Sequence, residues 1–86
     1  MKTAVYGMGR FGTFWARLLA EKFEVYGYSR SGRELPSQIK TIEEEKEFKE
    51  FDVIFLCCSI SAVEEVLNRI SKYVKPGAVV LDTCSV

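Results

Sequence analysis

Three closely spaced glycines constrain this chain more than any other feature, because they stand where a strand pattern gives way to a helix pattern. The stretch VYGMGRFGTFW contains Gly7, Gly9 and Gly12, and a short strand pattern over residues 2–7 leads into it. A second strand pattern, EVYGYS, begins at Glu24. In that context the spacing G-x-G-x-x-G predicts a turn that presents bare backbone to a dinucleotide.

Each glycine has a separate mechanical role in such a turn. Gly7 makes the tight bend, Gly9 lets a pyrophosphate approach the backbone, and Gly12 lets the helix pack closely on the strand. The helix N-terminus then offers N–H groups and a partial positive charge to the phosphates. A turn without a ligand would need one glycine but not three at this spacing. The residues between the glycines are expected to contact the same ligand: Met8, Arg10 and Phe11.

Apolar residues at helical spacing predict two helices that lie on a core. The stripe of the first, over residues 10–22, is Phe11, Phe14, Trp15, Leu18 and Leu19. The stripe of the second is Val63, Val66, Leu67, Ile70 and Val74, after a capping-box pattern of Ser61 and Glu64. Another such pattern, Thr41 with Glu44, precedes a short helix in IEEEKEFKEF, where only Ile42, Phe48 and Phe51 can be buried. Its acidic run is interpreted as a solvated helix face rather than a recognition patch.

The remaining apolar runs complete an alternation of strands and helices. DVIFLCC, over residues 52–58, and AVVLD, over residues 78–82, read as strands buried in a parallel sheet. Residues 39–42 are predicted as a further short edge strand. The order predicts an α/β Rossmann-type fold, a parallel sheet of four to five strands with helices on both faces. Residues 1–86 would form one dinucleotide-binding domain.

The residues after the second strand indicate which dinucleotide is bound. NAD-dependent domains usually carry a carboxylate there for the ribose hydroxyls. This chain has Ser29, Arg30 and Ser31, followed by Arg33, and no carboxylate before Glu34. An arginine fork with two hydroxyls supplies the donors and charge that a 2′-phosphate needs. We therefore expect NADP(H) as cofactor and partner, although a polar loop with surface arginines would read similarly.

Two further groups follow strands and should lie at the same edge of the sheet. Cys58, Ser59 and Ile60 are expected to flank the cofactor, with a simple helix cap as the alternative role of Ser59. Thr83, Cys84 and Ser85 should lie near the nicotinamide, unless they mark no more than the end of the last strand.

Composition narrows the classes of function. Twelve lysines and arginines balance twelve aspartates and glutamates, which argues against a nucleic-acid platform or a membrane-surface domain. Histidine is absent, so these residues offer no histidine metal ligand or acid–base catalyst, and no metal is expected. The three cysteines form no C-x-x-C pair and read as small hydrophobic residues in a reducing, cytoplasmic environment.

Several motifs together resemble a known family. GMGRFGTFWARLL, GYSRS, DVIFLCCSISAVEEVLNRI and VLDTCSV are similar to the N-terminal domain of the prephenate and arogenate dehydrogenases of tyrosine biosynthesis. The sharpest parts are SRS, as in the NADP-dependent arogenate branch, and the closing D-x-x-S-V. The resemblance implies an oxidative decarboxylation in which NADP takes a hydride from the ring carbon that bears the hydroxyl.

The resemblance also implies what these residues lack. It places Ser85 at the active site, beside substrate and nicotinamide, whereas the family's catalytic histidine and helical C-terminal domain have no counterpart here. That domain closes the substrate pocket and forms a homodimer in the family. The chain would then be the N-terminal part of a longer enzyme, able to bind the dinucleotide but not to turn over a substrate alone.

Two other classes share the glycine pattern. The β-hydroxyacid dehydrogenases often carry a basic residue after the second strand but lack the closing serine motif in this form. The regulatory nucleotide-binding domains of potassium channels and transporters usually carry an acid at that position, which the sequence SRS does not provide.

Overall fold

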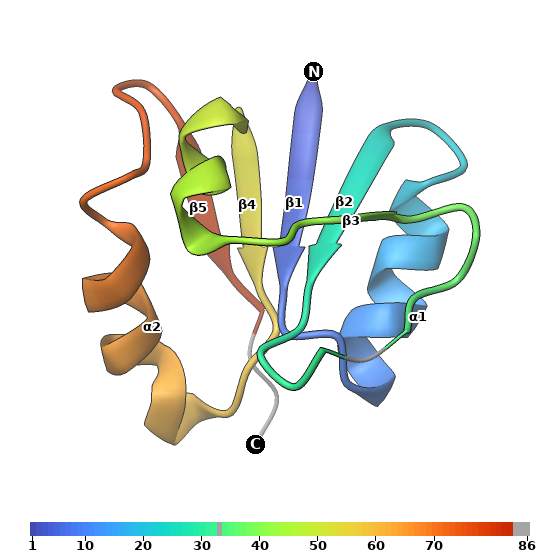
Figure 1. Ribbon diagram of the computed structural model, residues 1–86, viewed down its shortest axis with the longest axis horizontal. Helices are drawn as coiled ribbons and strands as arrows, with labels where there is room; N and C mark the ends of the chain where they lie inside the picture. Colours follow the sequence, from blue (N-terminus) through green and yellow to red (C-terminus); the bar gives the residue numbers. More distant parts are fainter. Residues whose placement is uncertain (33, 84–86) are drawn as a thin grey trace.

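The fold is a five-stranded parallel sheet with the spatial order β3-β2-β1-β4-β5. The computed structural model describes residues 1–32 and 34–83. The strands are β1 (Lys2–Tyr6), β2 (Glu24–Tyr28), β3 (Lys40–Thr41), β4 (Val53–Leu56) and β5 (Val79–Asp82). The helical elements are the α-helices α1 (Arg10–Leu19) and α2 (Val63–Ile70) and the 3-10 helices η1 (Glu45–Glu50) and η2 (Ile60–Ala62). Figure 1 shows the sheet between its two α-helices, which confirms the predicted Rossmann-type architecture.

Strand β1 lies in the middle of the sheet and pairs with both β2 and β4. The chain first builds outward from β1 to β2 and β3, then crosses over and builds β4 and β5 on the other side. The order of strands therefore reverses between β1 and β4. In open parallel sheets a ligand binds beyond the carboxyl ends of the strands at such a reversal.

Helices cover both faces of the sheet, as predicted. The face that carries η1 and α2, called the α2 face below, is filled by Ala4, Tyr6, Ile42, Phe48, Phe51, Ile54, Leu56, Val66 and Ile70. The opposite face, called the α1 face, is filled by Val5, Met8, Ala16, Val25 and Ile39. Alternation along β1 sends Tyr6 to one face and Val5 to the other. Among the described residues, no helix is long and apolar enough to cross a membrane.

The predicted apolar stripe of α1 is only partly in contact with the sheet. Gly12 and Ala16 are the buried residues of this helix, whereas Phe11, Phe14 and Leu18 keep 40, 58 and 46 % of their surface exposed. The expectation that the whole stripe lies on a core is therefore wrong. The periodicity identified the apolar side of the helix, but of the predicted stripe only Trp15 and Leu19 pack against the α1-face cluster.

The last strand also differs from its prediction. The apolar run predicts a buried strand, yet Val79 and Leu81 of β5 are 48 and 42 % exposed. β5 pairs with β4 and stands at the end of the strand order. Its register aligns Leu81 with Phe55, so these exposed residues lie on the α1 face, beyond the reach of α1.

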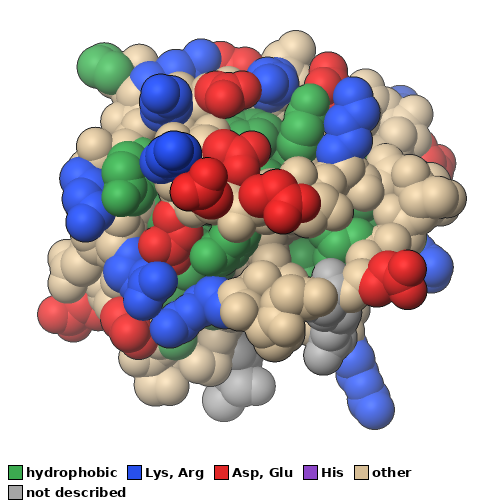
Figure 2. Space-filling view, viewed as in Figure 1, with side chains coloured by type: hydrophobic (Ala, Val, Ile, Leu, Met, Phe, Trp, Pro, Cys, Tyr) green, Lys and Arg blue, Asp and Glu red, His purple; other side chains and the backbone are tan. Residues whose placement is uncertain are grey.

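Neither predicted capping box forms. Thr41 belongs to β3, and the box uses Glu44 as N-cap of η1 with Glu47 three residues on. Ser61 lies within η2, and α2 begins after Ala62 without a side-chain cap. The buried residues of the η1 region are nonetheless those predicted, Ile42, Phe48 and Phe51. Figure 2 shows acidic side chains gathered over the middle of the α2 face and bordered by Lys and Arg, as in the pairs Lys2–Glu50 and Arg69–Glu45.

Candidate dinucleotide-binding site

Gly7 makes the bend that ends β1. Its φ is 100°, in the region that favours glycine, and its N–H donates to the carbonyl of Tyr28 at 2.9 Å. A Cβ built at this position would lie 2.7 Å from the carbonyl oxygen of Cys57. The backbones of β1, β2 and β4 thus converge on Gly7, and a larger residue would push them apart.

Gly9 leaves space that no described atom fills. A Cβ added there meets nothing within 4 Å. Gly9 is the N-cap of α1, no side chain caps this end, and the first turn has no acidic residue. The N-terminus of α1 therefore presents backbone donors and a partial positive charge to an anion.

Gly12 brings α1 against the turn. A Cβ at Gly12 would lie 1.9 Å from the carbonyl oxygen of Gly7 and 3.3 Å from Cβ of Cys57. No side chain fits at that distance, so the position of the α1 N-terminus relative to β1 and β4 depends on this glycine.

The end of β2 supplies hydroxyls and one guanidinium. The Oγ atoms of Ser29 and Ser31 lie 3.1 Å apart, and the N–H of Gly32 donates to the Ser29 carbonyl at 3.1 Å, closing a turn. Arg30 stands at the exposed tip of this turn. Arg33, also predicted to bind the cofactor, lies outside the described residues.

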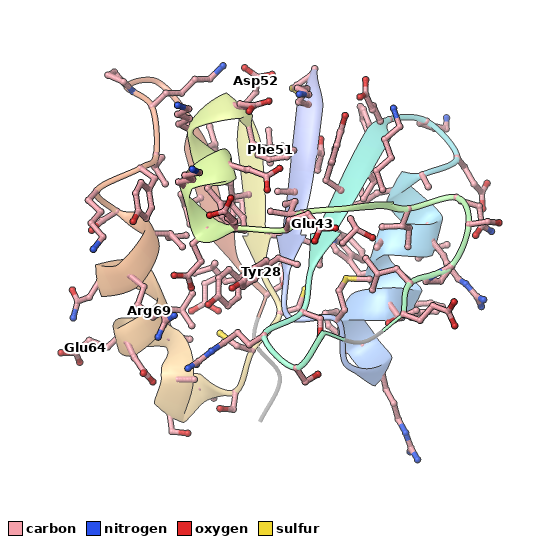
Figure 3. All side chains as sticks on the ribbon, in the orientation of Figure 1. Tyr28, Glu43, Phe51, Asp52, Glu64 and Arg69 are labelled. Carbon is pink, nitrogen blue, oxygen red and sulfur yellow. The ribbon has the colours of Figure 1, made fainter. Side chains whose placement is uncertain are left out.

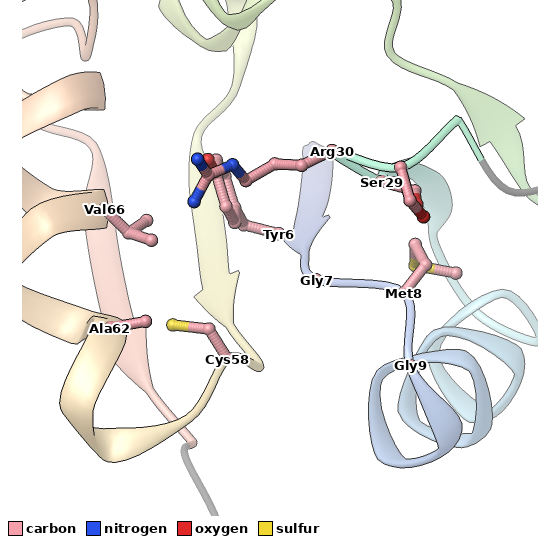
Figure 4. A pocket seen from close by; sticks show the side chains of 10 residues that line it. Tyr6, Gly7, Met8, Gly9, Ser29, Arg30, Cys58, Ala62 and Val66 are labelled. Carbon is pink, nitrogen blue, oxygen red and sulfur yellow. The ribbon is translucent and has the colours of Figure 1, made fainter.

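A cavity of about 260 Å³ joins these elements at the carboxyl ends of the strands (Figure 4). It is lined by Tyr6, Gly7, Met8, Gly9, Ser29, Arg30, Ser31, Cys58, Ala62 and Val66. Seven of the predicted residues are thus brought together, whereas Arg10, Phe11, Gly12, Ser59 and Ile60 are not part of this lining. Cys84 and Ser85 fall outside the described part of the chain.

Met8 and Ser59 have surroundings other than those expected. Met8 is only 3 % exposed, and its sulfur would lie 2.8 Å from a Cβ added at Gly27, so its side chain packs in the α1-face core. Ser59 precedes η2 and caps no helix by its side chain; its Oγ lies 3.2 Å from Oγ of Ser61.

The two neighbouring cysteines lie on opposite faces, as alternation predicts. Cys58 packs with the α2-face cluster, and its sulfur points toward Ala62 (Figure 4). Cys57 packs with the α1-face cluster, where its Sγ lies 3.1 Å from Oγ1 of Thr83. Burial raises the pKa of the Cys57 thiol. Neither forms a disulfide, and no cluster of three or more metal-ligating side chains occurs among residues 1–32 and 34–83.

Sequence reasoning missed three residues of the lining: Tyr6, Ala62 and Val66. The side chain of Arg30 reaches across the cavity to Tyr6, and Val66 of α2 faces it from the other side (Figure 4). Tyr6 could have been found, since it is the last residue of the strand before Gly7. The contribution of α2 depends on how this helix is placed, which no local pattern specifies.

Polar contacts hold the wall behind Tyr6. The Tyr6 hydroxyl donates to Oε2 of Glu45 at 2.8 Å, and Arg69 donates to both carboxylate oxygens at 2.9 and 3.1 Å. The hydrogen bonds from Arg69 are the main cause that holds the pKa of Glu45 below its ordinary value. Burial, together with the bond to Glu45, raises the pKa of Tyr6, so its hydroxyl keeps its proton.

The donor set fits NADP: an uncapped helix N-terminus beside an unfilled glycine, and serine and arginine after β2. Residues 2–85 match the family described as NADP oxidoreductase, coenzyme F420-dependent. The chain belongs to this family. It is therefore an NADP-binding oxidoreductase domain, and no curated protein matches it significantly.

Solved structures give the same fold in several enzymes. The chain is 24 % identical to Synechocystis arogenate dehydrogenase, with a TM-score of 0.80, over 100 % of this chain and 34 % of that one. For Plasmodium falciparum pyrroline carboxylate reductase with NADP bound the values are 19 %, 0.82, 98 % and 33 %. For the A. aeolicus prephenate dehydrogenase with hydroxyphenyl propionate and NAD⁺ they are 21 %, 0.78, 100 % and 34 %. The chain thus spans about a third of the solved structures that it matches.

Proposed function

We propose that this chain is the NADP-binding portion of a prephenate or arogenate dehydrogenase. The observation that carries the cofactor half of the proposal is the cavity shared by Gly9, Ser29 and Arg30, at the reversal of strand order. The substrate half is supported by the closing D-x-x-S-V motif and by the structural likeness to arogenate and prephenate dehydrogenases.

Each residue has a defined part in this proposal. The N–H groups at the start of α1 bind the pyrophosphate, which approaches over Gly9. Ser29, Ser31 and Arg30 bind the 2′-phosphate, and the Arg30 guanidinium stacks on the adenine. The adenosine lies in the cavity between Arg30 on one side and Cys58 and Val66 on the other.

The bound NADP⁺ supplies the acceptor for the hydride. In the proposed reaction the ring carbon bearing the hydroxyl loses a hydride, the carboxylate leaves as carbon dioxide, and the ring becomes aromatic. Ser85 would lie beside the substrate, while the catalytic histidine, the rest of the substrate pocket and the contacts of a homodimer would come from a C-terminal domain. The chain alone should therefore bind NADP⁺ without turning over prephenate or arogenate.

Titration calorimetry with NADP⁺ and NAD⁺ tests the cofactor half. Arg30→Ala should weaken NADP⁺ binding about 10- to 100-fold, because a charge-assisted contact is lost, and leave NAD⁺ nearly unchanged. Arg17→Ala is the matched control, since Arg17 is exposed on α1 and is not among the residues that line the cavity. Equal weakening of both dinucleotides by Arg30→Ala would contradict the assignment.

The substrate half is tested on the complete enzyme. With NADP⁺, NADPH formation should follow addition of prephenate or arogenate but not of a β-hydroxyacid. With NADPH, a reductase substrate such as pyrroline carboxylate should cause no NADPH oxidation. Activity only with the β-hydroxyacid or the reductase substrate would show that the chain belongs to another dehydrogenase or reductase of the same fold.

A further inference from the structure

A charged pair joins two elements beside the cavity. Glu45, at the start of η1, accepts hydrogen bonds from Arg69 of α2 on both carboxylate oxygens. The side chain of Glu45 is only 16 % exposed and that of Arg69 is 40 % exposed. The Glu45 carboxylate is thus largely shielded from water, whereas the Arg69 guanidinium reaches it from the solvent side.

The pair lies behind Tyr6, which lines the cavity and packs against Tyr28. Glu45 accepts the hydrogen bond of the Tyr6 hydroxyl at 2.8 Å, and the rings of Tyr6 and Tyr28 lie 4.9 Å apart. Arg69 extends from α2 toward Tyr28 (Figure 3). The Glu45 carboxylate is thus one tyrosine ring away from the cavity that Tyr6 lines.

Arg30 approaches Tyr6 from the side of the cavity opposite Glu45. Its side chain extends over the cavity in the direction of Tyr6 (Figure 4), and its charge acts on the Tyr6 hydroxyl and on Glu45. Burial raises the pKa of Tyr28, and the charges of Arg69 and Arg30 both oppose that rise. One carboxylate is therefore within the electrostatic reach of two guanidinium groups.

Removing one of the two cations would change what the other one does. Without Arg69, Glu45 would be a partly buried carboxylate without its ionic partner, and such a charge is costly. It would hold the Arg30 guanidinium on the Tyr6 side of the cavity more strongly and would repel a phosphate that approaches Arg30. With Arg69 in place the carboxylate is neutralised, and Arg30 remains available to an anion.

We propose that Arg69 is a positioning residue for cofactor selectivity: by neutralising Glu45, it keeps the Arg30 guanidinium available for the 2′-phosphate of NADP. Arg69 acts through Glu45 and touches no part of the cofactor. The proposal rests on the role given to Arg30 above. It adds a determinant from α2, 39 positions along the chain from Arg30.

The test compares four variants of the chain by calorimetric titration with NADP⁺ and with NAD⁺. Arg69→Ala should weaken NADP⁺ about five- to tenfold and NAD⁺ less than about twofold, because only the 2′-phosphate senses the uncompensated carboxylate. Arg69→Lys retains the charge and should stay within about twofold of the unmodified chain for both. Glu45→Gln and the double variant Glu45→Gln/Arg69→Ala should likewise retain tight NADP⁺ binding, within about twofold.

A role confined to stability would give a different pattern. In that case Arg69→Ala would lower the melting temperature and weaken the binding of both dinucleotides alike, and adding Glu45→Gln to Arg69→Ala would not restore NADP⁺ binding; either result overturns the proposal.

Arg30→Ala separates the two proposals. If it leaves NADP⁺ binding intact, the Arg30 assignment and this inference both fail; if it is selective while Arg69→Ala is not, only this inference fails.

Discussion

The α2 face of the sheet is filled by large side chains, whereas the α1 face is closed next to Gly12 by a near approach of backbones. On the α2 face the ring centroids of Tyr6 and Phe48 lie 5.6 Å apart, and those of Phe48 and Phe51 lie 6.0 Å apart. On the α1 face, Gly12 and Ala16 are the buried residues of α1, and a Cβ at Gly12 would meet the Gly7 carbonyl oxygen.

This difference suits the two halves of the site. In the proposed binding mode the pyrophosphate needs backbone donors and no side chain in its way, which the glycines next to α1 provide. In the proposed binding mode the adenosine end lies against Tyr6 and Val66 of the α2 face, and the Glu45–Arg69 pair stands behind Tyr6. The α2 face should therefore be destabilised when a side chain is made smaller, and the α1 face when a side chain is added at Gly12.

The largest effect is expected from Phe48→Ala on the α2 face. Phe48 is fully buried, and its removal leaves a cavity that should lower the free energy of unfolding by about 3–5 kcal/mol. Phe14→Ala on the exposed side of α1 is the matched control and should change it by less than about 1 kcal/mol. Urea denaturation followed by circular dichroism measures both, and equal losses would remove the distinction between the faces.

Gly12→Ala should be destabilising although alanine favours helices. The added methyl group cannot fit beside the Gly7 carbonyl, and overpacking of this kind costs about 1–3 kcal/mol. Gly9→Ala meets no atom and should leave the unfolding curve nearly unchanged, while NADP⁺ binding weakens because the methyl group occupies the approach of the pyrophosphate. A stable Gly12→Ala domain would show that α1 is held by something other than this contact.

The ion pair of Glu45 and Arg69 should have a smaller effect, which appears in the pH dependence of the free energy of unfolding. The pKa of Glu45 is lowered from its ordinary 4.5, mainly by the hydrogen bonds from Arg69. A depressed pKa in the folded state stabilises the fold above pH 4.5, and this contribution is lost as the pH falls further and the carboxylate is protonated. Glu45→Gln should flatten that part of the curve of unfolding free energy against pH; an unchanged slope below pH 4.5 would contradict the account.

The smallest effect is expected at the open end of the α1 face. Leu81 on β5 is 42 % exposed, so Leu81→Ala should lower the free energy of unfolding by less than about 1 kcal/mol. Leu56 on the neighbouring strand faces α2 and is fully buried, so Leu56→Ala should cost about 2–5 kcal/mol. Similar losses at the two leucines would mean that the α1 face over β5 is covered in solution.

Much of the site could be predicted because its chemistry is local. The turn at Gly7, the open backbone at Gly9 and the close contact at Gly12 each follow from the absence of a side chain at one position. Ser29, Arg30 and Ser31 follow a strand directly, so they lie at its end in any parallel sheet. Glu45 and Arg69 were missed, because their contact joins η1 to α2 across 24 positions of the chain.

The sequence by itself determined the order of the elements, the parallel sheet and the glycine turn, because periodicity and backbone freedom are properties of short stretches. Only the tertiary structure decided that Phe11, Phe14 and Leu18 stay exposed and that β5 has an open face. An apolar stripe records that a helix has a side suited to a core, but which part is covered depends on the width of the sheet beneath it. The same holds for the cavity, whose far wall exists only once α2 is packed on the α2-face cluster.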